Sequence, residues 1–160
     1  MKDLLSYLYV LIISAVPLIE QRGAIPWGII VKDLAPIPVF LVSLLGSLLP
    51  APIILLMFNT IFKWMKKYKS LSKITDFIEK KLQKNTPKIE KYKEIGLIAF
   101  IGVPLPTTGV WTGSAVAAFL GLDFKKSLFC AFAGAVISAA ILTAVSILAP
   151  AFLEQIGIHF

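Results

Sequence analysis

The chain has 160 residues, 58% of them hydrophobic, and carries a formal net charge of +7. Its mean hydropathy of +0.85 and its several long apolar runs are typical of a small integral membrane protein, and its length excludes two domains of ordinary size. Eleven of the sixteen lysines and arginines fall between Lys63 and Lys93. This block lies between apolar segments, so it indicates the cytoplasmic side of a membrane and not a nucleic-acid interface. We therefore expect one multi-pass domain in the cytoplasmic membrane.

The first part of the chain alternates short apolar segments with helix breakers. The segments Leu4–Val16 and Trp27–Leu34 are each too short to span a bilayer alone. Between them, Pro17–Pro26 contains two prolines and a glycine, which predict a break in the helix. Two more prolines around Ile37 predict a turn. From there to about Trp64 the sequence is apolar enough to span, with a kink expected at its internal prolines.

The middle of the chain, Lys66–Glu94, differs in composition. Apolar residues recur every three or four positions with lysines among them, at Leu71, Ile74, Ile78 and Leu82 and at Lys73, Lys80, Lys81 and Lys84. This pattern predicts a basic amphipathic helix on the membrane surface, in contact with anionic lipid. A solvated linker helix is the alternative. Pro87 is expected to interrupt the helix.

From Ile95 the order of the first half returns. A short apolar run, Ile95–Val103, is followed by a break at Pro104–Gly109 and by a helix expected over Trp111–Leu122. A polar turn at Asp123–Lys126 leads to a second long span, Ser127–Leu148, which we expect Pro150 to end.

The two halves can be aligned, because Val16-Pro-Leu18 matches Val103-Pro-Leu105 and Gly46 then corresponds to Gly134. If each broken segment returns to its own side, Lys125 and Lys126 share the cytoplasmic face with the basic block, which satisfies the positive-inside rule. We therefore predict an all-α integral membrane fold. It is an inverted repeat of two re-entrant broken hairpins and two long transmembrane helices. The repeats cover residues 1–65 and 95–150, with the basic segment 66–94 between them and a tail at 151–160.

The first break is the main candidate site, because Glu20 and Arg22 lie there beside Gly23 and Pro26. An ionisable residue at membrane depth is a functional candidate by default. In extended backbone, residues two apart point the same way, so the two charges could share a cavity. Arg22 could hold an anion such as phosphate in a fork of hydrogen bonds, and Glu20 could carry a coupling proton. Alternatively, the two charges only neutralise each other and fix the loop.

The second break supplies the remaining candidates. They are Pro104, Pro106, Thr107, Thr108, Gly109 and Trp111. The threonine hydroxyls and the glycine backbone can approach a ligand, and the helix that begins near Val110 directs its positive end into the break, which suits an anion. The alternative is that the threonines cap this helix.

Enzyme chemistry has little support in the sequence. The one histidine, His159, is next to the last residue, so no histidine-based triad or metal cluster can be built around it. We expect no catalytic residues, no metal and no cofactor.

The two breaks, Pro17-Leu-Ile-Glu-Gln-Arg-Gly-Ala-Ile-Pro26 and Pro104-Leu-Pro-Thr-Thr-Gly-Val-Trp-Thr-Gly113, resemble those of the small multidrug export protein family. More distantly, the chain is similar to DedA/VTT-type membrane proteins over about Leu4 to Pro150. This resemblance implies two opposed re-entrant hairpins, a homodimer, and movement of lipids or of lipid-linked carriers such as undecaprenyl phosphate. It also makes Glu20 the acidic residue of the first hairpin. DedA relatives have a basic residue in the second hairpin, where this chain has threonines.

Three functions follow from these observations. The first is a transporter or flippase for an anionic lipid or lipid-phosphate carrier, with a proton as a possible coupling ion. The second is a proton-coupled exporter of small molecules, and the third is a non-transporting scaffold whose basic helix binds anionic lipid.

Overall fold

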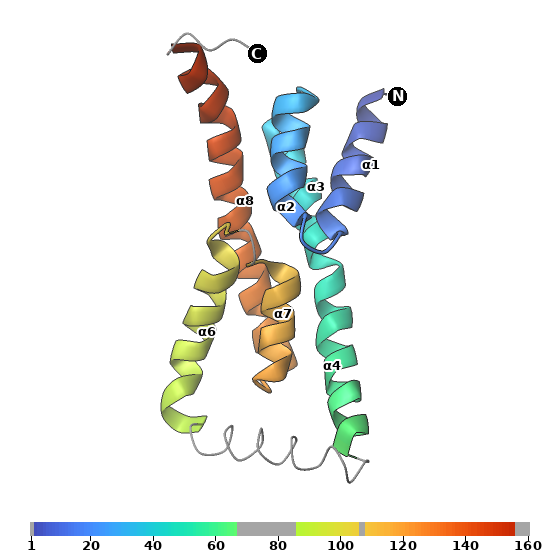
Figure 1. Ribbon diagram of the computed structural model, residues 1–160, viewed down its shortest axis with the longest axis vertical. Coiled ribbons are helices and arrows are strands. Elements are labelled where there is room, and N and C mark those ends of the chain that lie inside the picture. The colour runs from blue at the N-terminus through green and yellow to red at the C-terminus, as the bar shows by residue number, and fades with distance from the viewer. Residues whose placement is uncertain (1, 67–85, 106–107, 156–160) are drawn as a thin grey trace.

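The computed structural model describes residues 2–66, 86–105 and 108–155, and every regular element in these ranges is a helix (Figure 1). The elements are α1 (Lys2–Ala15), α2 (Glu20–Pro26), the π-helix η1 (Trp27–Val31), α3 (Pro36–Leu48), α4 (Pro50–Lys66), α6 (Thr86–Gly102), α7 (Val110–Phe119) and α8 (Phe124–Gln155). Among the described residues, two segments are long and apolar enough to cross a membrane, Pro36–Met57 and Phe124–Pro150. The predicted all-α class and the two long apolar helices are confirmed.

The helices form two hairpins beside two long helical segments. We call α1, α2 and η1 the first hairpin, and α6 and α7 the second hairpin. In Figure 1 the hairpins occupy opposite halves of the long axis, and their turns meet near its middle. The α3–α4 segment and α8 run along much of the axis in opposite directions. Within each half, the first helix of the hairpin packs on the long helix that follows it, α1 on α3 and α6 on α8.

The first break is shorter than the sequence predicts. α1 ends at Ala15, as expected from Pro17, because the residue before a proline disfavours helical backbone. The prediction that the chain stays broken as far as Pro26 is wrong, since α2 begins at Glu20 and contains Pro26. Pro26 lacks an N–H and so removes one helical hydrogen bond. The π-helix η1 follows it directly, and the Lys32 N–H closes its wider turn by donating to the Trp27 carbonyl (3.1 Å).

The long segments differ from prediction mainly at their ends. The internal prolines coincide with an interruption at Leu49, between α3 and Pro50 of α4, while the expected kink stays a prediction. The turn expected around Ile37 lies earlier, because α3 already begins at Pro36, and proline is tolerated in the first turn of a helix. Pro150 does not end α8, which continues to Gln155. A proline is tolerated within a long apolar helix when the freed backbone group finds another partner.

The middle of the chain lies partly outside the described residues. The predicted amphipathic stripe and its lysines, from Leu71 to Lys84, fall in that part. α6 begins at Thr86 and runs to Gly102, so Pro87 lies in its first turn and the expected boundary at Glu94 is absent from this helix. At the start of α8, the N–H groups of Lys125 and Lys126 donate to Oδ1 of Asp123 (3.0 and 3.2 Å), so the polar turn is a helix cap.

Two glycines allow the long helices to approach the hairpins closely. A Cβ at Gly46 of α3 would overlap the carbonyl oxygen of Leu11 in α1. A Cβ at Gly134 of α8 would lie 2.6 Å from Cβ of Ile101 in α6. Small residues at such contacts are what brings membrane helices together. The two glycines aligned in the sequence therefore occupy comparable packing positions, each against the first helix of its own hairpin.

Alanine at either position is expected to lower the free energy of unfolding by about 1–3 kcal/mol, because the contacts are with backbone or branched atoms that cannot move freely. Gly96→Ala in α6 is the matched control, since nothing lies within 4 Å of a Cβ there. Helix propensity alone favours that change by up to about 1 kcal/mol. Unfolding in detergent would measure all three variants. Equal stability of Gly46→Ala, Gly134→Ala and Gly96→Ala would contradict this packing.

Candidate functional site

The turns of the two hairpins are joined by one carboxylate. The N–H of Val110 donates to Oε2 of Glu20 (3.1 Å), and the N–H of Trp111 donates to Oε1 (3.0 Å). The Glu20 side chain is buried, with 6% of the residue exposed. A carboxylate at a helix N-terminus meets two unpaired backbone donors and the positive end of the helix dipole. Glu20 of the first hairpin therefore caps α7 of the second.

The backbone on both sides of this contact is unusual. Gly109, which precedes α7, has φ of 152°, and a Cβ there would overlap the Glu20 carboxylate. Across the contact, Leu18 and Glu20 adopt left-handed φ values of 72° and 46°. Such values cost non-glycine residues energy and persist only where surrounding contacts hold them. The two turns are therefore shaped to bring the carboxylate against the start of α7.

Thr108 has a different role from the predicted cap. Its hydroxyl donates to the Val103 carbonyl (2.7 Å) and accepts from the Leu105 N–H (3.2 Å), so it closes the turn before α7. The N-cap position of α7 is Gly109, which has no side chain to cap the helix. The interpretation of Thr108 as a helix cap is wrong, because the Glu20 carboxylate already occupies the α7 N-terminus. Thr107 lies outside the described residues.

Arg22 is bound to the second hairpin through a neutral partner. Its Nη2 donates to Oγ1 of Thr108 (3.1 Å). Among the described residues, no ion pair within 4.0 Å joins Arg22 to Glu20, but the two charges still interact electrostatically, so mutual neutralisation stays a prediction. The predicted extended backbone is wrong here, since Arg22 lies in α2. The two side chains nevertheless line one cavity.

The cavity between the hairpin turns has a volume of about 230 Å³. Residues of both hairpins line it: Pro17, Leu18, Glu20, Arg22, Thr108, Trp111, Thr112 and Ala115. The indole N–H of Trp111 donates to the Ala15 carbonyl at the end of α1 (3.1 Å), which fixes the ring in the wall. The cavity thus combines an aromatic and aliphatic wall with one carboxylate, one guanidinium and two hydroxyls.

Of the ten candidate residues, Glu20, Arg22, Thr108 and Trp111 line this cavity, and Gly109 contacts Glu20. The other described candidates are not among its lining residues: Gly23, Pro26 and Pro104. Gly23 lies against the side chain of Ile19. Pro106, like Thr107, lies outside the described residues.

Gln21 is a buried polar residue that the sequence analysis missed. Its Nε2 donates to Oγ of Ser47 in α3 (2.6 Å), and the Ser47 hydroxyl donates to the Leu44 carbonyl (3.0 Å). This bond fixes α2 to the long helix of its own half. The signal was available in the sequence, because Glu20, Gln21 and Arg22 are three consecutive polar residues in an apolar region.

The family comparison covers both sides of this site. The family described as "Putative small multi-drug export protein" matches residues 20–141, more than half of the chain. The chain belongs to this family. The match to the small multi-drug export family begins at Glu20, the residue that joins the hairpins, and includes all of α7. It confirms the resemblance predicted from the two breaks.

No curated protein and no solved structure matches the chain significantly. The more distant similarity to DedA/VTT-type proteins is not shown by these comparisons and stays a prediction. Membership of the export family, together with the two long apolar helices, supports a membrane protein.

Proposed function

We propose that the protein is a proton-coupled membrane exporter of small amphipathic cations. The single observation that carries the proposal is the buried Glu20 carboxylate, which lines the cavity and holds the two hairpins together. The description of its family as small multi-drug export proteins agrees with this substrate class. Trp111 adds an aromatic wall, which attracts a cation, while Arg22 is engaged by Thr108.

Proton binding and substrate binding compete for the same carboxylate. Protonation replaces one acceptor oxygen of Glu20 with an O–H donor, so one of the two α7 N–H groups loses its partner. Hydrogen bonds to a charged group contribute about 1.5–3 kcal/mol each, so this change loosens the contact between the hairpins. A cation that enters the cavity restores the charged form and expels the proton. Alternate occupancy by proton and cation couples their movements in opposite directions.

The membrane arrangement that we propose is the inverted repeat of two re-entrant hairpins, in a homodimer. Three features support the repeat: the hairpins lie in opposite halves of the long axis, their turns meet near the middle, and α1–α3 packing corresponds to α6–α8 packing. The homodimer is what the DedA resemblance implies. Gly46 and Gly134 take comparable places in the two packed pairs. Such folds place substrate near the bilayer midplane, where this cavity would lie.

Arg22 favours a second candidate, the flippase for an anionic lipid or lipid-phosphate carrier. Its guanidinium lines the cavity and can bind a phosphate with the donors that Thr108 does not occupy. The α7 N-terminus, which we expected to attract an anionic ligand, is already capped by Glu20. This occupancy makes the cation exporter the better-supported function.

Arg22→Lys distinguishes the two candidates. Lysine keeps the charge and loses the planar fork. Proteoliposomes with an imposed pH gradient would be assayed for uptake of ethidium and, separately, for flipping of a fluorescent undecaprenyl phosphate analogue. We expect ethidium uptake by Arg22→Lys within about twofold of the wild type.

Lys125→Gln, which removes an exposed charge at the start of α8, is the control and should match the wild type in both assays. Flipping without ethidium uptake, with a tenfold loss in Arg22→Lys, would select the lipid function instead. The absence of both activities from folded wild-type protein would contradict transport and favour the scaffold.

A further inference from the structure

A second cavity lies on the first hairpin, apart from the Glu20 site. Its volume is about 340 Å³, and the described residues that line it are Leu5, Ser6, Tyr9, Trp27 and Lys32. None of these residues lines the cavity between the hairpin turns. The proposed transport mechanism uses none of them.

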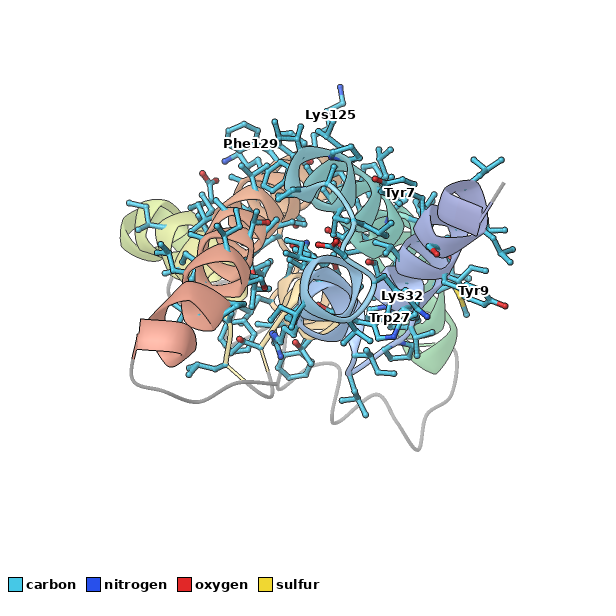
Figure 2. All side chains as sticks on the ribbon, turned by 90° about the horizontal axis from the view of Figure 1, so that it is seen from above. Tyr7, Tyr9, Trp27, Lys32, Lys125 and Phe129 are labelled. Atoms are coloured by element: carbon cyan, nitrogen blue, oxygen red, sulfur yellow. The ribbon has the colours of Figure 1, made fainter. Side chains whose placement is uncertain are left out.

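A cation and two aromatic rings are organised in this second cavity. Nζ of Lys32 lies 5.3 Å from the centroid of the Trp27 ring, within the range of a cation–π contact. The Tyr9 ring meets Trp27 edge-on, with centroids 6.3 Å apart and an interplanar angle of 77°. Figure 2 shows the three side chains together on one side of the molecule. Because η1 is a π-helix, residues five apart, Trp27 and Lys32, fall on the same face.

The position of this cluster in the fold suits the surface of a membrane. Lys32 follows the last residue of η1, and Leu5 lies in the first turns of α1, so both are at the end of the first hairpin opposite its turn. Tryptophan, tyrosine and lysine gather at this level because each has an apolar body and a polar tip. Leu5 and Tyr9 are about half exposed, which leaves an apolar wall beside the exposed ammonium.

We propose that this cavity binds an anionic membrane phospholipid. The Lys32 ammonium contacts the headgroup phosphate, and the rings and Leu5 contact the glycerol and the first acyl carbons. Charge complementarity supports this occupant, because Lys32 is a cation and none of the other described residues of the lining is acidic. A zwitterionic lipid would bring its own ammonium group to the same place. Free phosphate could contact the Lys32 ammonium, but it has no apolar part to cover Leu5 and the two aromatic rings.

Quenching of Trp27 fluorescence by brominated lipids tests the proposal directly. A variant with Trp64 and Trp111 replaced by phenylalanine makes Trp27 the only reporter, and circular dichroism checks its fold. It would be placed in nanodiscs with brominated phosphatidylglycerol or, at the same mole fraction, brominated phosphatidylcholine. One lysine near an anionic surface strengthens binding to that surface by about 1 kcal/mol, which is about fivefold. We expect that preference for phosphatidylglycerol, retained in Lys32→Arg and lost in Lys32→Gln.

Lys125→Gln is the matched control for loss of one positive charge and should keep the preference. Native mass spectrometry of the chain with all its tryptophans, comparing wild type with Lys32→Gln in an equimolar mixture of the two lipids, provides an independent measurement. Equal quenching by the two lipids, or a preference that survives in Lys32→Gln, would show interfacial anchoring only and overturn the proposal. Loss of the preference in excess inorganic phosphate would also overturn it, because the site would then recognise free phosphate.

Discussion

Glu20→Gln is expected to reduce gradient-driven ethidium transport at least tenfold and to abolish its dependence on pH. The amide keeps the shape of the carboxyl and cannot release or take up a proton. Its one oxygen takes the place of only one of the two carboxylate oxygens, which accept separately from Val110 and Trp111. The amide nitrogen would then face a backbone donor, so we also expect the free energy of unfolding to fall by about 1–3 kcal/mol.

The control for this change is Glu94→Gln. Glu94 forms an ion pair with Lys126 (3.0 Å) away from the cavity, and both side chains are partly exposed. An exposed pair of this kind contributes little to stability, so transport and its pH dependence should stay at the wild-type level. Transport would be measured in proteoliposomes, and unfolding in detergent. A folded Glu20→Gln protein with normal, pH-dependent transport would show that the carboxyl is structural and contradict proton coupling through it.

The sequence predicts the positions of the helices better than the contacts of the site. The long apolar helices follow from hydrophobic runs, and the end of α1 follows from Pro17, because both signals are local. The helical state of α2 was missed, since Pro26 predicts a break and only surrounding packing allows it to lie within a helix. Pro150 was misjudged because one proline need not end a long apolar helix.

The contact that defines the site could not be predicted. It joins Glu20 to Val110 and Trp111, about 90 positions away, and neither the carboxylate nor the helix start identifies the other as its partner. The sequence did mark both sides separately, as a charge in one break and as the positive end of a helix in the other. From the sequence, the start of α7 was assigned to an anionic ligand, because nothing in the sequence indicates that the Glu20 carboxylate occupies it.

Gly109→Ala is the second change with a large expected effect. Its φ of 152° lies in a region that only glycine adopts readily, and the new Cβ would overlap the Glu20 carboxylate. Backbone strain and overpacking each cost about 1–3 kcal/mol, so we expect the free energy of unfolding to fall by about 2–4 kcal/mol and transport to be lost. Gly121→Ala, just beyond the other end of α7 with φ of 66°, is the control for backbone strain at a left-handed glycine. It should cost about 1–2 kcal/mol.

A double-mutant cycle separates the two causes. Glu20→Ala removes the carboxylate that the new methyl group would meet, and it leaves the strain at position 109 unchanged. If the overlap matters, the double variant is more stable than the sum of the single changes predicts by at least about 1 kcal/mol, within the range measured for contacting residues. Purely additive effects would mean that Gly109 is needed only for its backbone conformation. The proposed fit between the carboxylate and the start of α7 would then be wrong, because a tightly held carboxylate cannot accommodate an added methyl group without cost.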